Sequence, residues 1–73
     1  MNTKEKLIRI FRSPYTFMIK NELRHRNGEW DRWIVWRHVG EPGNRFIRSS
    51  EGFKDVDECL DDCITYIESL KNA

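Results

Sequence analysis

The residues of this sequence that could carry out chemistry are few and scattered. Its two histidines, His25 and His38, lack a cysteine or acidic partner at the spacing that a metal site requires. No glycine-rich phosphate loop is present, because Gly40 and Gly43 flank a proline in a turn-like segment. We therefore predict no catalytic residues, no metal site and no cofactor, and expect the histidines to be surface or hydrogen-bonded residues of a protein that is not an enzyme.

The two cysteines are the only candidate nucleophiles of sulfur type. Cys59 and Cys63 are four residues apart, on the apolar side of a predicted helix and among carboxylates that would raise a thiol pKa. A disulfide between them would close almost no loop, and no wider cysteine framework exists. We expect buried thiols in a reducing compartment. With no signal-peptide core and no apolar run of about 18 residues, the chain is predicted to be cytoplasmic and not membrane-bound.

Charge is distributed unevenly along the chain. Residues 1–50 carry eleven basic and five acidic residues, whereas residues 51–73 carry two basic and seven acidic ones. The acidic cluster at the start of the last predicted helix has two interpretations, a solvated helix face or a patch that attracts a basic protein partner. The residues of this protein-partner patch are Asp57, Glu58, Asp61 and Asp62.

A stretch in which arginines alternate with aromatic residues, residues 20–48, is the other candidate surface. Arginine suits bidentate contact with phosphates and guanine edges, and aromatic rings can stack on bases. The alternative is that the rings belong to the core and the arginines cover the sheet. The candidate nucleic-acid-binding residues are Arg24, Arg26, Arg32, Arg37, Arg45 and Trp30.

The element that positions the acidic cluster is a predicted helix over residues 55–70. Apolar residues recur there at helical spacing and form one continuous stripe. Asp55 with Glu58 has the pattern of a capping box. The stripe consists of Val56, Cys59, Leu60, Cys63, Ile64, Ile67 and Leu70.

The basic and aromatic residues fall in three predicted strands that form a meander over residues 15–49. Apolar residues alternate with polar ones from Tyr15 to Leu23, and Asn27-Gly28 is a strong hairpin signal. Residues 30–39 are apolar at both parities, with Trp30 and Trp33 on opposite faces, which is typical of a central strand. Residues 40–44 predict a second turn and residues 45–49 a short third strand.

Residues 1–13 are compatible with a helix or with an extra edge strand. We favour a short helix capped by Thr3, with Leu7, Ile10 and Phe11 on one face. The whole chain, 1–73, is then one small α+β domain of the order αβββα. One helix cannot cover both sheet faces, so we expect either a homodimer or an N-terminal segment that folds back as a cover.

Residues 27–30, the aromatic strand after them and residues 50–54 resemble the small YegP-like family. This resemblance implies a meander, a Gly-aromatic step and a helix, often paired in repeats or dimers, without a defined biochemical role. Gly28-Glu29-Trp30, Arg45-Phe46-Ile47 and Gly52-Phe53-Lys54 are also similar to pieces of the DNA-binding domains of ethylene-response factors and of integrase arm-type domains. That resemblance implies a sheet that enters the major groove, with Arg24, Arg26, Arg32 and Arg37 as groove-facing residues.

The order αβββα is also that of double-stranded-RNA-binding domains, in which lysines at the start of the second helix bind phosphates. Here that position holds Asp55, Asp57 and Glu58, which would repel RNA. The leading hypothesis is therefore a non-enzymatic module that binds duplex DNA through its sheet. The alternative is a protein-binding inhibitor or adaptor, of the type that phages and mobile elements encode, acting on a host complex.

Overall fold

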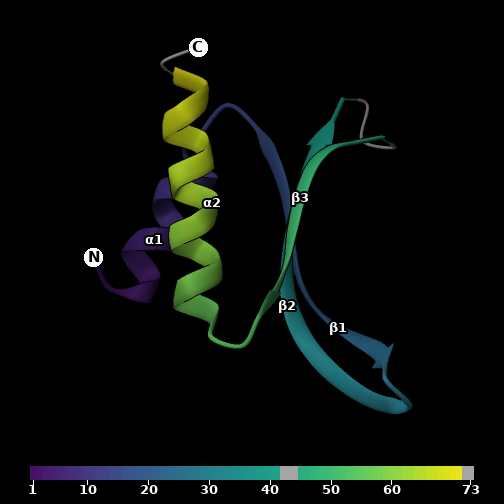
Figure 1. Cartoon of the computed structure of the whole chain (residues 1–73). Coiled ribbons are helices and arrows are strands. Elements are labelled where there is room, and N and C mark those ends of the chain that lie inside the picture. Colours follow the sequence, from purple (N-terminus) through teal and green to yellow (C-terminus); the bar gives the residue numbers. More distant parts are fainter. Residues whose placement is uncertain (42–44, 72–73) are drawn as a thin grey trace.

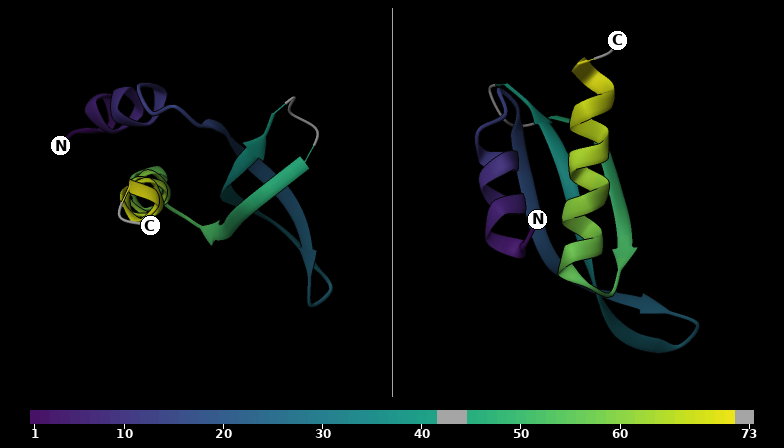
Figure 2. Two further views of the ribbon diagram at one scale, coloured as in Figure 1. Left: turned by 90° about the horizontal axis from the view of Figure 1, so that it is seen from above. Right: turned by 90° about the vertical axis from the view of Figure 1, so that its left-hand side faces the viewer.

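The computed structural model describes residues 1–41 and 45–71 and confirms the predicted α+β architecture. The turn predicted at residues 40–44 lies largely outside this part of the chain. Three antiparallel strands form an open sheet, with both helices on one side of it (Figures 1 and 2). The elements are α1 (Thr3–Phe11), β1 (Thr16–Arg26), β2 (Glu29–Gly40), β3 (Arg45–Phe53) and α2 (Val56–Lys71).

Helix α2 buries its apolar stripe against the sheet. Cys59, Leu60, Cys63 and Ile67 are fully buried, and they share one core cluster with Trp36 of β2. The side chain of Asp55 accepts a hydrogen bond from the backbone N–H of Asp57, as expected of an N-cap residue. Val56, at the beginning of the stripe, is wrongly predicted as core, because its side chain is 41% exposed.

The sheet has β2 in its centre, as its apolar residues at both parities predict. The hairpin turns at Asn27 and Gly28, both of which have positive φ angles. β3 is longer than predicted and continues to Phe53, which pairs with Ile34 of β2. The pairing resumes there after a register irregularity that contains Gly52, with φ +95°. The pairing of β1 with β2 places Trp36 and Trp33 on opposite faces.

Helix α1 confirms the helical alternative for the N-terminus, but two details of that prediction are wrong. The cap is Asn2, whose side chain and that of Glu5 form a reciprocal capping box. Thr3 instead donates its hydroxyl hydrogen to Asp57 of α2, at 2.8 Å. Phe11 is 77% exposed, because only Ile10 and part of Leu7 reach the core.

The position of α1 decides what the sheet exposes. α1 packs beside α2 on the same side of the sheet (Figure 2). The N-terminal segment therefore does not cover the second sheet face. The β1–β2 hairpin curves away and extends beyond both helices (Figure 1). No described helix is long and apolar enough to cross a membrane.

Candidate binding surfaces

The helices cover one face of the sheet, and this face contributes to the core. Its polar side chains form hydrogen bonds with α2. The Trp36 indole N–H donates to Asp62 at 2.8 Å, and His38 Nδ1 lies 2.6 Å from the Tyr66 hydroxyl. Burial lowers the pKa of His38. His38 is thus a core residue that is hydrogen-bonded to the helix, in agreement with the interpretation of the sequence.

The opposite side of the sheet, which we name the uncovered face, carries a balanced set of charges. Residues that pair directly across antiparallel strands lie on the same face, so the register defines its members. Its basic residues are Lys20, Arg24, Arg26 and Arg37; its acidic residues are Glu22, Glu29 and Asp31, with Glu51 joined to them through Arg24. Four positive and four negative side chains therefore share a face that the sequence predicts to be basic.

Glu22 is the centre of this charge arrangement. Its carboxylate accepts hydrogen bonds from Arg24 at 2.7 Å and from Arg37 at 3.0 Å, and Arg24 also pairs with Glu51. Arg37 and, next, Arg24 lower the pKa of Glu22 to about 2. Both guanidinium groups are consequently neutralised by carboxylates of the same face.

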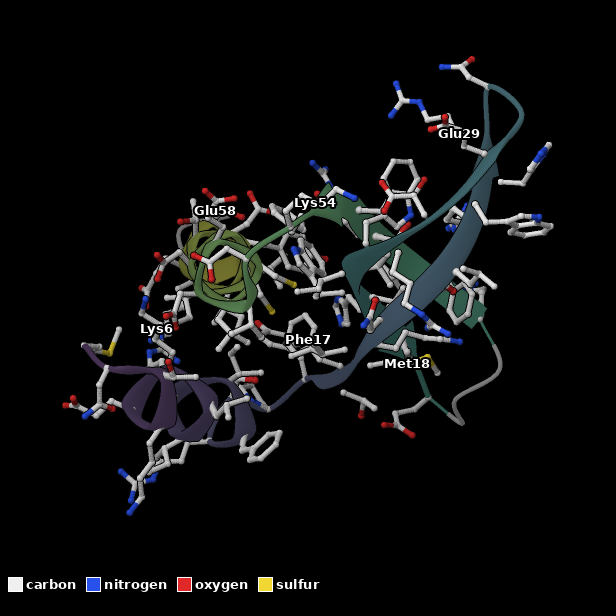
Figure 3. All side chains as sticks on the ribbon, turned by 90° about the horizontal axis from the view of Figure 1, so that it is seen from below. Lys6, Phe17, Met18, Glu29, Lys54 and Glu58 are labelled. Atoms are coloured by element: carbon white, nitrogen blue, oxygen red, sulfur yellow. The ribbon has the colours of Figure 1, made fainter. Side chains whose placement is uncertain are left out.

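Apolar side chains lie beside this network. Met18 and Phe46 are 41% and 57% exposed, next to the buried Val35 and Val39. The guanidinium of Arg37 lies 5.2 Å from the centre of the Phe46 ring. One end of the uncovered face is therefore an apolar patch bordered by ion pairs, far from the labelled Glu29 at the hairpin tip (Figure 3).

The hairpin tip carries a second group of aromatic and basic residues. Trp30 is 68% exposed and lies against His25, with ring centres 4.9 Å apart. On the other face of the hairpin, Arg24 and Arg26 lie 5.8 and 5.6 Å from the Trp33 ring. The buried Trp33 Nε1 has no hydrogen-bond partner in the described part of the chain.

The structure does not bring the six predicted nucleic-acid-binding residues onto one surface. Arg24, Arg26 and Arg37 lie on the uncovered face, of which only Arg26 has no carboxylate partner in residues 1–41 and 45–71. The register puts Arg32, Arg45 and Trp30 on the opposite face. Sequence parity predicts this division, but it does not show which arginines are neutralised.

Two of the four residues in the acidic patch predicted for a protein partner form ion pairs with α1. Lys6 contacts Asp61 at 3.0 Å and Asp57 at 3.5 Å, and it lies between the two helices (Figure 3). Asp61 is the first cause of the raised pKa of Lys6. With Asp62 bonded to Trp36, only Glu58 of the patch points away from α1 into solvent. Because Arg9 also pairs with Glu68 further along, α1 and α2 run in the same direction.

The cysteines and potential metal ligands offer no site in the described residues. Cys59 and Cys63 are buried free thiols. Burial is the first cause that raises their pKa values, to about 11 and about 12. No group of three or more His, Cys, Asp or Glu side chains there could hold a metal ion.

Three residues that define the uncovered face were not among the binding residues predicted from the sequence: Met18, Glu22 and Phe46. A signal for Glu22 was present, because a single acidic residue at the parity of Lys20 and Arg24 faces them in a strand. Comparisons with protein-family models, curated proteins and solved structures find no match to this chain. The resemblances to YegP-like, ethylene-response-factor and integrase arm-type domains therefore stay predictions.

Proposed function

We propose that this protein is a non-enzymatic protein-binding module, of the inhibitor or adaptor type, that contacts its partner with the uncovered face. The observation that supports this proposal most is the pairing of Glu22 with both Arg24 and Arg37. A surface whose arginines are already neutralised attracts phosphates weakly, because phosphate binding depends on uncompensated positive charge.

The composition of the uncovered face supports the same proposal. Protein interfaces combine an apolar centre with a polar rim and are enriched in aromatic residues, methionine and arginine. Met18 and Phe46 provide exposed apolar groups next to Val39, and Arg37 lies over Phe46. The surrounding ion pairs would then form the rim and determine the orientation of the partner.

The test is capture of proteins from the lysate of a candidate host, with and without nuclease. The double variant Met18→Glu, Phe46→Glu should lose at least about tenfold of the captured protein, because two carboxylates would be buried in the interface. Phe11→Glu is the control, since Phe11 is also apolar and exposed but belongs to α1. Capture that survives the double variant, or that nuclease abolishes, would contradict the proposal.

Sedimentation of the purified protein at tens of micromolar tests whether a second copy of the chain occupies the same face instead. A species of 8.9 kDa agrees with a face reserved for another protein. A stable dimer that Met18→Glu dissociates would assign the face to a second copy, as the homodimer prediction has it, and would overturn the partner proposal.

Nucleic-acid binding is the second candidate function, and the hairpin tip is the observation that favours it. Trp30 is exposed there, and Arg26 and Arg32 form no ion pair with any described residue. If this hairpin binds duplex or single-stranded DNA, Arg26→Gln should lower the log–log salt slope by about 1. Glu22→Gln should strengthen binding by releasing Arg24 and Arg37. No binding at low salt would exclude this function.

A further inference from the structure

The outer edge of β3 is open to another strand. β3 pairs with β2 alone, and no other segment in residues 1–41 and 45–71 makes a backbone hydrogen bond to its free side. In an antiparallel strand alternate residues direct their N–H and C=O groups to opposite sides, so this edge presents a row of unpaired groups. Proteins usually block such edges with proline, lysine, β-bulges or a covering element. β3 contains neither proline nor lysine, and its two register irregularities lie towards its ends.

The central part of this edge has regular geometry. Register irregularities lie on either side of it, near Phe46 and near Gly52, whereas Arg48, Ser49 and Ser50 pair in order with β2. A short extended segment could therefore align with this part of β3 without meeting a bulge.

A groove of about 470 Å³ runs beside the same edge, between β3 and α2. It lies where α2 packs more closely against β2 than against β3. A strand added to β3 would direct every second side chain into this groove. Its lining includes Trp36, Arg48, Ser50, Asp62, Tyr66 and Leu70.

The groove contains one basic and one acidic side chain, Arg48 and Asp62. The guanidinium of Arg48 lies 5.8 Å from the centre of the Tyr66 ring, and His38 in turn holds the Tyr66 hydroxyl. Arg48 has no ion pair with any of the residues that the structure describes. The Asp62 carboxylate keeps its negative charge, but it accepts the Trp36 indole N–H and forms no ion pair with Arg48. A ligand in this groove is therefore best matched by an acidic side chain at Arg48.

We propose that β3 binds an extended segment of a partner protein as a fourth strand, with an acidic side chain on Arg48. The next groove-facing side chain, two residues away, is apolar and packs against Trp36, Tyr66 or Leu70. Backbone hydrogen bonds to β3 supply affinity and the two groove positions supply selectivity, as in other cases of strand addition. This site goes beyond the proposed function, since it lies on another surface and each can hold without the other.

The experiment uses the isotope-labelled full chain and a synthetic probe, the capped peptide Ser-Thr-Glu-Thr-Val-Thr-Ser. Titration should shift backbone amide signals of β3 and of residues 62–70, while those of Met18 and Glu22 stay unchanged. A peptide with Gln in place of Glu should bind about tenfold more weakly, because it lacks the charge-assisted contact. Arg48→Gln should abolish this preference. Arg45→Gln, which removes a charge from the same strand outside the groove, should retain it.

Two N-methylated versions of the Glu peptide test strand pairing itself. Methyl groups on alternate amides block one edge of an extended peptide, so one version should lose binding and the other keep it. The proposal is overturned if the peptide does not bind at millimolar concentration, if shifts fall on the uncovered face, or if Arg48→Gln keeps the preference for Glu. It is equally overturned if both methylated versions bind like the parent peptide.

Discussion

Both faces of the sheet carry aromatic and polar side chains, but the polar groups find different partners on each face. On the covered face, Trp36 and His38 each make one hydrogen bond to α2, and their buried rings both contact Phe17 and Tyr66. On the uncovered face, Glu22 binds two arginines and the rings stay partly exposed. A polar side chain under α2 thus forms a hydrogen bond in the core, whereas one on the face without a helix forms an ion pair at the surface.

The first way to sharpen this comparison is a matched pair of truncations. Leu60→Ala on the covered side should cost about 2–5 kcal/mol, because it leaves a cavity in a close-packed core. Met18→Ala on the uncovered face should cost less than about 1 kcal/mol, since Met18 is 41% exposed. Chemical denaturation measures both. Equal losses would mean that the two faces are packed alike.

Thiol labelling tests the covered side independently. Cys59 and Cys63 are fully buried and their pKa values are raised, so thiolate is scarce at neutral pH. We expect labelling at least about a hundredfold slower in the native protein than in denaturant, and no effect of reductant on the melting temperature. Leu60→Ala should accelerate the reaction. Fast labelling of the native parent would show that the helix does not seal the core.

The smallest expected effect concerns the ion pairs of the uncovered face. The folded-state pKa of Glu22 is lowered from 4.5 to about 2. Its contribution to stability is therefore present above about pH 4.5 and is lost as the pH falls towards 2. The parent should melt above Glu22→Gln at neutral pH, and the difference should shrink in acid. Protonation of His38, whose pKa burial lowers, acts on both proteins and cancels in the difference.

A control for this pH prediction is Glu29→Gln on the same face, at the hairpin tip. Glu29 has no ion pair with the residues that the structure describes, so the change should leave the acid limb of the stability curve as in the parent. A melting difference for Glu22→Gln that persists at pH 2 would contradict the ion-pair interpretation.

Much of the fold follows from local sequence patterns. The spacing of Leu60 and Ile67 predicts α2, and Asn27-Gly28 predicts the hairpin. Both depend on interactions within a few residues, so no long-range contact is needed to recognise them. The ion pairs of the candidate surfaces could not be predicted, because a charge count along the chain cannot show that Arg24 contacts Glu51 or that Lys6 pairs with Asp61.

Because periodicity of 3.6 or 2 is a property of the backbone, the sequence predicts α2, the three strands and which strand residues share a face. It left residues 1–13 open between a helix and an edge strand. That α1 lies beside α2 rather than across the second sheet face depends on tertiary contacts. In this position α1 contacts acidic residues of α2, and it covers neither the uncovered face nor the edge of β3. The physical reason is that α1 is held in place by the burial of Ile10 in the core and by contacts with Asp57 and Asp61 of α2. These contacts join residues that are far apart in the sequence.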